Sequence, residues 1–398
     1  MPALTNSLIA RTAAIELSNK LVVANLVNRG WEEEYTKTVN GYKPGATVNV
    51  KRPARYTVID GPTIGAYQAS DEVPVPITIN RNKIVPMDYS HTDLTLNISE
   101  FKERFLDNAI NDLVHAIDSD IMSLYNTVPN FVGTPGQVPN GFDPFAAASA
   151  RMTYESSPTA DRHVMIEPLT EASVASQVKS LGVNMSEDAF ERGEIGRIAS
   201  AKAYSTAQVR THTVGALGGT PVVAGASQTG LVLNISGATA SVTNWLRRGD
   251  VITVANHFGV NPMNRQPQPY TKTYCVAADV TTTAGGLAAI PLTTPITPTG
   301  AFQTVTASPA NGAAVTVLTG PANSTFAQNL MFHKNAFAFV CVPQSMVSAP
   351  VCELVTYKNI SLRLVRSFDT TNGREQCRLE ALYGFAAIYP ELACRITA

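Results

Sequence analysis

Residues 97–126 read NISEFKERFLDNAINDLVHAIDSDIMSLYN, and this stretch carries the strongest helical pattern in the chain. Asn97 is suited to cap its N-terminus, and Glu100 follows three residues later, as in a capping box. A helix over the whole stretch would be about 45 Å long, far above the average. We therefore expect a spine helix on which a domain is built. Its apolar residues form one stripe: Phe101, Phe105, Ile110, Leu113, Val114, Ile117, Ile121 and Leu124.

The segment at residues 4–30 also has apolar residues at near-helical spacing. Gly30 supplies a stop, so the pattern predicts one helix or two short ones. Such a helix either packs on its own chain or forms an arm that docks on a neighbouring subunit. The pattern does not distinguish these alternatives.

Residues 44–90 change to strand periodicity and predict two long strands joined by the polar tip DGPTIGAYQASDE at 60–72. Each strand of about 12 residues would reach roughly 40 Å. Pro74 and Pro76 cannot donate to a ladder, so we expect the second strand at an edge or on its own. Because an isolated two-stranded ribbon is marginal in water, we expect a neighbouring copy to support it.

The remainder of the chain predicts a mixed α/β region with a β module inside it. Residues 145–220 alternate helical and strand patterns, whereas 221–327 hold six charged residues and short β-rich runs between turns. This spacing fits a small antiparallel barrel or sandwich. Apolar strand character resumes at NAFAFVCVPQ (335–344), so the module interrupts the α/β region. Near the C-terminus, Asn372-Gly373 between alternating runs predicts a β-hairpin.

Composition limits the classes of function. Charged residues are 15% of the chain against about 25% in a typical domain, and the net charge of −1 argues against a dedicated nucleic-acid binder. Five widely spaced cysteines without a CxxC motif predict free buried thiols in a reducing compartment. With no apolar run of about 18 residues and no leader pattern, we expect neither export nor a membrane span.

A search for catalytic motifs gives no active site. The SxxK pattern of Ser176 and Lys179 lacks a following KTG, the adjacent acids Glu187 and Asp188 are poorly placed to share one substrate, and the six histidines are dispersed without ligand spacing. We expect neither an enzyme nor a cofactor or metal. The basic run KRPARY at 51–56 fits a solvated strand face or an inter-subunit salt bridge better than a nucleic-acid contact.

Residues 246–254, LRRGDVITV, contain the cell-adhesion tripeptide Arg248-Gly249-Asp250. Adhesion requires an exported protein, and the sequence predicts no export. We instead expect Gly249-Asp250 to form the turn that enters a strand of the β module, with Arg248 on the surface beside it.

The order of these parts resembles that of tailed-phage major capsid proteins of the Hong Kong ninety-seven type. The module introduced by LRRGDVITV, the beginning LTNSLIARTAAIELSNKL and the ending ALYGFAAIYPELACRITA are similar to the Salmonella podovirus coat protein variant. The resemblance implies an α+β phage major capsid fold with an inserted small β-barrel domain. Its parts would be an N-terminal arm (1–40), an extended loop (44–90), a peripheral domain (91–139 and 351–398) with the spine helix 97–126, an axial domain (140–220 and 328–350) and the inserted domain (221–327).

The same resemblance implies a shell protein that forms hexamers and pentamers of an icosahedral capsid around the double-stranded DNA of a tailed bacteriophage. Implied partners are identical subunits, a scaffolding protein, a portal and DNA contacted non-specifically on the inner surface; a decoration protein is left open. The virion would be assembled in the host bacterial cytoplasm. A surface covered by copies of the chain would account for the sparse charge.

Some members of this family cross-link their shells through a lysine near the loop tip. Here the tip has no lysine and Lys51 lies back along one strand, so we expect non-covalent maturation. Alternatives are an encapsulin-like bacterial nanocompartment shell of the same fold, or a β-rich tail-associated binding module. Candidate inter-subunit contacts are Lys51, Arg52, Arg55, Tyr67, Asp71 and Glu72.

Overall fold

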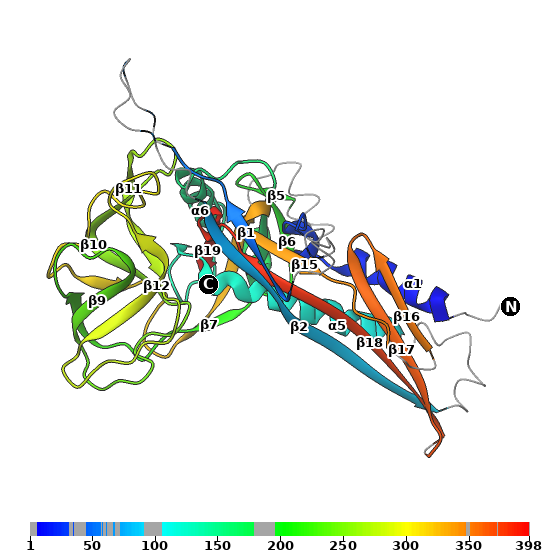
Figure 1. Ribbon diagram of the computed structural model, residues 1–398. Helices are drawn as coiled ribbons and strands as arrows, with labels where there is room; N and C mark the ends of the chain where they lie inside the picture. Colours follow the sequence, from blue (N-terminus) through cyan, green and yellow to red (C-terminus); the bar gives the residue numbers. More distant parts are fainter. Residues whose placement is uncertain are drawn as a thin grey trace. The chain divides into compact units, whose positions relative to one another are not determined.

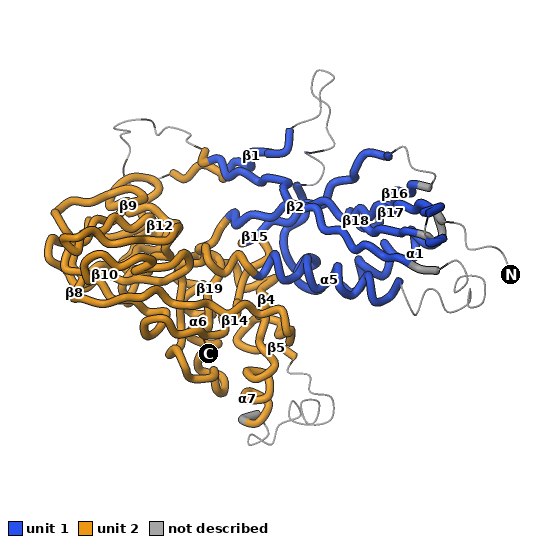
Figure 2. Tube along the Cα trace, turned by 90° about the horizontal axis from the view of Figure 1, so that it is seen from below, with its two compact units in different colours: residues 1–51, 74–122, 337–388 blue, residues 52–73, 123–336, 389–398 orange. Residues whose placement is uncertain are grey.

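The computed structural model describes residues 6–31, 35, 45–56, 58, 61, 67, 72–90, 106–178, 196–347, 351–371 and 373–397. Its helices and strands are shown in Figure 1. The chain divides into two compact units, coloured in Figure 2, and each is described by itself. Unit 1 comprises residues 1–51, 74–122 and 337–388, and unit 2 comprises residues 52–73, 123–336 and 389–398.

Unit 1 is built on an antiparallel sheet in the order β1-β2-β18-β17-β16, with β15 also paired to β18. The expected C-terminal hairpin is confirmed, since β17 and β18 pair from Asp369 opposite Arg374 to Arg363 opposite Glu380. The strands are β1 (Thr47–Arg52), β2 (Val73–Ser90), β15 (Phe337–Cys341), β16 (Val351–Tyr357), β17 (Ile360–Asp369) and β18 (Arg374–Ala387).

Helix α5 (Asp107–Met122) confirms the spine helix over its described part, and the 3-10 helix η3 (Ser123–Thr127) follows it. The expected stripe is buried at Ile110, Leu113, Val114, Ile117, Ile121 and Leu124. Residues 97–105, with the expected cap at Asn97, lie outside the described residues.

A buried carboxylate on α5 anchors the N-terminal helices α1 (Asn6–Lys20) and α2 (Val23–Leu26). Asp118 is 4% exposed and accepts the backbone N–H groups of Val22 and Ala24 at 3.0 and 3.1 Å. These donors have no partner within a helix, so Asp118 caps α2 from 96 residues away. Burial raises the pKa of Asp118 in spite of these bonds. Residues 6–27 therefore match the alternative of a helix packed on its own chain.

The position of β2 corrects the expectation that its prolines place it at an edge or on its own. β2 lies between β1 and β18, and its residues Ile79–Ser90 pair with β18 of the same chain. Pro74 and Pro76 precede this register, so their missing N–H groups remove no bond to β18. Much of the second strand is thus supported by its own chain, and the argument that it needs a neighbouring copy was wrong for this part.

Unit 2 contains a sheet in the order β3-β19-β14-β4-β6-β5, with β7 paired to β14. The region 145–220, expected to alternate helices and strands, contains the helices α6 (Asp143–Tyr154) and α7 (Pro168–Val178). The core of this sheet includes Phe145 and Met152 of α6. Its strands are β3 (Asn130–Val132), β4 (Arg162–Ile166), β5 (Arg197–Ile198), β6 (Ala201–Ser205), β7 (Thr211–Thr213), β14 (Thr325–His333) and β19 (Ala393–Thr397), with 3-10 helices η5 (Lys334–Ala336) and η6 (Pro390–Leu392).

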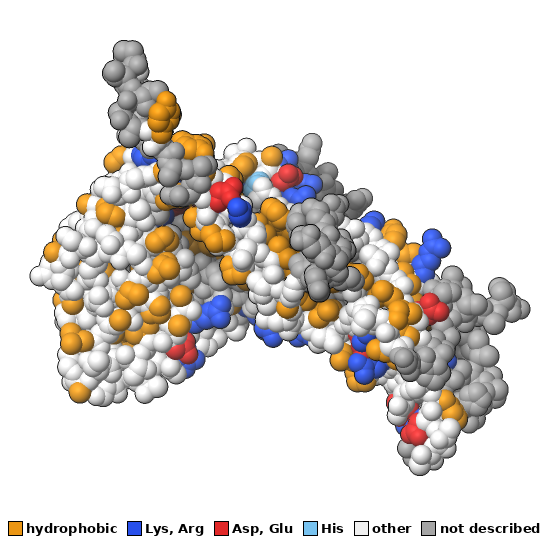
Figure 3. Space-filling view, viewed as in Figure 1, with side chains coloured by type: hydrophobic (Ala, Val, Ile, Leu, Met, Phe, Trp, Pro, Cys, Tyr) orange, Lys and Arg blue, Asp and Glu red, His pale blue; other side chains and the backbone are white. Residues whose placement is uncertain are grey.

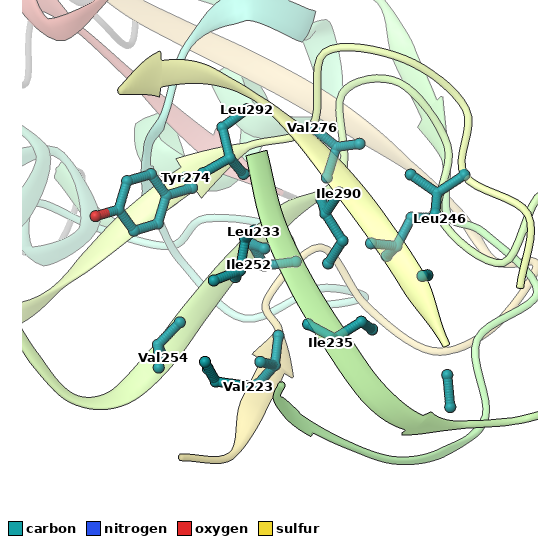
Figure 4. Packing of buried hydrophobic residues seen from close by; sticks show 14 of the residues in the cluster. Val223, Leu233, Ile235, Leu246, Ile252, Val254, Tyr274, Val276, Ile290 and Leu292 are labelled. Atoms are coloured by element: carbon teal, nitrogen blue, oxygen red, sulfur yellow. The ribbon is translucent and has the colours of Figure 1, made fainter. Parts of the chain in front are cut away.

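The β-rich runs of residues 221–327 pack around one apolar core, part of which is shown in Figure 4. They make two three-stranded sheets, β11-β10-β13 and β12-β9-β8. Bridges from Val276 to Leu292 and from Val222 to Ala314 join the sheets on both sides, which closes a barrel. The strands are β8 (Gly219–Val223), β9 (Gly230–Ala238), β10 (Val251–Val260), β11 (Pro267–Cys275), β12 (Ala288–Ile296) and β13 (Val315–Val317).

The two units are coarser than the expected division into arm, loop and three domains, which stays a prediction. Residues 123–139 and β19 fall in unit 2, whereas we expected both in the peripheral domain with the spine helix. The reason is pairing: β19 lies between β14 and β3, two strands of the unit 2 sheet.

A buried histidine in the barrel leads to a prediction about pH. His257 is 3% exposed, its Nε2 lies 2.7 Å from the Tyr274 hydroxyl, and burial together with nearby Lys272 lowers its pKa to about 4. The unfolded chain binds this proton near pH 6.5, so stability present above pH 6.5 is lost as the pH falls toward 4.

We expect this histidine alone to contribute a loss of about 2–3 kcal/mol between pH 6.5 and 4. Urea unfolding at several pH values should show a shallower loss for His257→Gln than for the unaltered chain. An equal pH slope in both proteins would contradict the assignment.

Candidate subunit-contact surface

The structure describes five of the six candidate contact residues. Tyr67 is 92% exposed, and Lys51 and Glu72 are also exposed. Asp71 lies outside the described residues. Arg52 and Arg55 are half-buried, and both engage groups of their own chain.

The side chains of Arg52 and Arg55 converge on one carboxylate. Arg52 Nη1 and Arg55 Nη2 lie 3.3 and 3.9 Å from Oε1 of Glu391. The Arg52 guanidinium also lies 4.7 Å from the ring centre of Tyr389, and that of Arg55 lies 5.9 Å from the ring centre of Phe302. Within unit 2, these two arginines therefore bind a carboxylate of their own chain, and their expected role as contacts to a neighbouring subunit stays a prediction.

Sequence reasoning missed Glu391, because it is 339 residues from Arg52 and no local pattern connects them. Glu391 lies between β18 and β19, and the sequence around it predicts only that an apolar segment ends there. A long-range pairing of this kind leaves no periodic signal in the sequence.

The adhesion-like tripeptide has the expected turn. Gly249 has a φ of 98°, a conformation that favours glycine, and β10 begins at Val251. Arg248 is exposed, but Asp250 is 0% exposed. Since a receptor cannot reach this carboxylate, the tripeptide is a structural turn.

Buried charges tie the barrel to helix α6 within unit 2. Lys272 Nζ of β11 lies 2.7 Å from Oε1 of Glu155, and both side chains are nearly inaccessible. Arg151 of α6 donates to the Thr273 hydroxyl at 3.0 Å and lies 4.2 Å from the ring centre of Tyr270. The barrel is thus fixed to the neighbouring sheet by oriented polar contacts.

The surface beside this junction is open and uncharged. A cavity of about 600 Å³ lies between α6 and the β10–β11 turn. Phe142 and Tyr154 line it and are 60% and 43% exposed, and Met263 in the same turn is 79% exposed. On the face seen in Figure 3, charged side chains are sparse over the barrel. Large apolar side chains that are exposed close together, as these three are, are typical of surfaces that contact other proteins.

The histidines, cysteines and acidic residues bear on metal binding in the described part of the chain. No group of three or more His, Cys, Asp or Glu residues in it could hold a metal ion. The five cysteines are free thiols; four of them are buried, as expected, whereas Cys352 is half-buried. Burial raises the pKa of Cys275 to about 11 and that of Cys394 to about 12. Among the described helices, none has the length and apolarity required to cross a membrane.

Comparisons with known proteins bear on the family and the fold. The family model described as P22 coat protein, gene protein 5, matches residues 19–395. A comparison with curated proteins gives no match. A solved structure from Mycobacterium phage Che8 is 14% identical, with a TM-score of 0.50 and coverage of 94% of this chain and 90% of that one. At this identity the likeness shows the fold alone.

Two further structures are more distant. The capsid of cyanophage P-SCSP1u is 10% identical, with a TM-score of 0.45 and coverage of 94% and 96% of the two chains. The holo-SrpI encapsulin complex from Synechococcus elongatus PCC 7942 is 8% identical, with a TM-score of 0.43 and coverage of 88% and 81%.

Proposed function

Since this chain belongs to the P22 coat protein family and is a capsid shell protein, we propose that it forms the hexamers and pentamers of an icosahedral shell around the double-stranded DNA of a tailed bacteriophage. The observation that carries the proposal is the family match from residue 19 to residue 395. The expected α+β phage capsid fold agrees with it.

Assembly from weak contacts fits the physical character of the surface. Rings of heterologous contacts close by rotation, and each copy makes several contacts at once. A single contact of about −4 kcal/mol gives only millimolar affinity, but several together stabilise a shell while misplaced subunits can still leave. The low charge and the exposed apolar side chains of the loop and barrel support such contacts.

We further propose that assembly proceeds through a scaffold-dependent procapsid with a portal, inside the host cytoplasm, and that the inner surface contacts DNA non-specifically. Maturation would be non-covalent, because residues 57–82 of the loop contain no lysine. Denaturing gels of mature particles should therefore show a single monomer band, and a ladder of covalent oligomers would contradict this part of the proposal.

Expression of the chain with and without a co-expressed scaffolding protein tests the function. Electron microscopy and sedimentation should show closed shells of uniform size when the scaffold is present. A folded monomer that forms no particles under any condition would overturn the proposal. Uniform shells that need no scaffold and enclose an enzyme would instead favour the nanocompartment alternative.

A further inference from the structure

Three basic side chains lie in one row across neighbouring strands of the unit 2 sheet. Lys202 of β6 is opposite Arg197 of β5 in an antiparallel pair, and opposite His163 of β4 in a parallel pair. Side chains paired in this way point to the same face of a sheet. Because adjacent strands are about 4.8 Å apart, the row spans roughly 10 Å. We call Arg197, Lys202 and His163 the basic row.

The outer end of the basic row is open to solvent. β5 is the last strand in the order of this sheet, and both Arg197 and Lys202 are exposed. In the described part of the chain, neither side chain takes part in an ion pair. Like charges directly opposite each other destabilise a strand pair. The described residues therefore carry an electrostatic cost at this edge of the sheet, which a bound polyanion would offset.

A tight hairpin holds the two exposed cations opposite each other. Ala199 and Ser200 join β5 to β6 with φ angles of 45° and 71°, a left-handed conformation that residues other than glycine rarely adopt. The Ser200 hydroxyl lies 3.0 Å from the hydroxyl of Ser149 on α6. The backbone N–H of Ala203 donates to the backbone oxygen of Gly196 at 3.0 Å. The backbone that carries the cations is therefore fixed on both sides of the turn.

The charges around the inner end of the row are mostly positive as well. His163 is 8% exposed, and its Nδ1 has no hydrogen-bond partner among the described residues. Burial lowers the pKa of His163, and the charge of Lys202 lowers it further. His333 and the exposed Lys334 act in the same direction, whereas Asp161 acts against them. With one acidic group against several basic ones, this end of the sheet attracts an anion from solvent.

We propose that the basic row, together with Lys334 beside it, contacts the phosphates of double-stranded DNA without reading its sequence. Arginine and lysine bind phosphate oxygens, and such contacts carry no sequence information. Each DNA strand carries one phosphate per about 3.4 Å of helix axis, so a row of roughly 10 Å can meet two or three phosphates. The inference rests on the proposed function, because a shell protein meets packaged DNA only if the shell encloses a genome.

Binding of a fluorescent DNA duplex of about 30 base pairs to the full chain, measured by anisotropy between about 20 and 200 mM salt, tests the proposal. In the double variant Arg197→Gln with Lys202→Gln, the slope of log K against log salt should become shallower by about 2, and the affinity in low salt should fall about tenfold or more. The thermal midpoint should rise by about 1–3 °C, because the opposed like charges are gone.

The matched control is the double variant Lys20→Gln with Arg248→Gln. It removes the same charge from two exposed side chains outside the basic row. Its slope should stay within about 0.5 of that of the unaltered chain.

The salt slope decides between the outcomes. A slope in the row variant equal to that of the unaltered chain, or an equal change in the control, overturns the inference. Fluorescent poly-L-glutamate is the probe for an acidic protein partner: if the row variant loses binding to it while the DNA slope is unchanged, the row serves such a partner and the proposal is wrong. Shell formation with the scaffold tests the function separately. No shells from the unaltered chain would overturn the proposed function and this inference with it, whereas shells with an unchanged DNA slope would overturn the inference alone.

Discussion

Replacement of Asp250 by alanine is expected to lower the free energy of unfolding of unit 2 by about 3–5 kcal/mol. The carboxylate is fully buried and accepts four hydrogen bonds. Oδ1 lies 2.9 Å from both His212 Nε2 and the Thr319 hydroxyl, and Oδ2 accepts the backbone N–H groups of Arg247 and Gly215 at 2.7 and 3.2 Å. The truncation leaves these buried donors without an acceptor, which costs far more than an average hydrogen bond.

The network beyond Asp250 adds to this cost. His212 Nδ1 lies 3.2 Å from the Tyr125 hydroxyl. Both ring nitrogens have a partner when the Tyr125 hydroxyl donates to Nδ1 and His212 donates from Nε2 to Asp250, and this assigns the tautomer of His212 from the hydrogen-bond network. Loss of the carboxylate thus leaves the imidazole without its acceptor as well.

Denaturant unfolding followed by the fluorescence of Trp245 measures the effect. This tryptophan is 1% exposed in the barrel core, and the only other one, Trp31, can be replaced by phenylalanine. Arg248→Ala is the matched control, because that side chain is exposed within the same tripeptide, and we expect a change of less than about 0.5 kcal/mol. Equal effects of the two substitutions would show that Asp250 does not organise the turn.

The parts of the fold that follow from local pattern were predictable. The apolar stripe of α5 identified a buried helix face, and the β-rich runs of 221–327 identified the strands of the barrel, because periodicity reports which side of an element is covered. The turn at Gly249 was predictable for the same reason. Glycine adopts a positive φ without steric cost, so a glycine directly before a β-rich run predicts a turn from local sequence alone.

The parts that depend on distant pairing were not predictable. Pro74 and Pro76 suggested an edge strand, but the residues that decide the matter are those from Ile79 onward, which pair with β18 almost 300 positions later in the chain. Similarly, Arg52 and Arg55 were identified as interface candidates by charge, yet their partner Glu391 has no sequence signal. Charge shows that a side chain needs a partner, and only the fold shows which chain segment supplies it.

The same limit applies to Lys272, one of six charged residues in 221–327. The sequence predicts a charged residue on a strand to be solvated, whereas this side chain is 5% exposed and is paired with Glu155 on the C-terminal end of helix α6. Burial of a charge is tolerated here because the partner is buried with it at 2.7 Å. The pair therefore locates a junction between barrel and sheet that composition alone could not show.

Lys272→Met is accordingly expected to lower the free energy of unfolding of unit 2 by about 3–5 kcal/mol, because it leaves the carboxylate of Glu155 buried without a counter-charge. Glu155→Met should cost a similar amount for the converse reason. The double substitution removes both charges and replaces them with apolar groups, so its cost should be only about 1–2 kcal/mol, well below the sum of the single effects. The four proteins form a double-mutant cycle that Trp245 fluorescence can follow in urea. If the losses of unfolding free energy in the two single variants simply add in the double variant, each charge is compensated separately. The junction between the barrel and helix α6 would then depend on Arg151 and its contacts instead of on this ion pair.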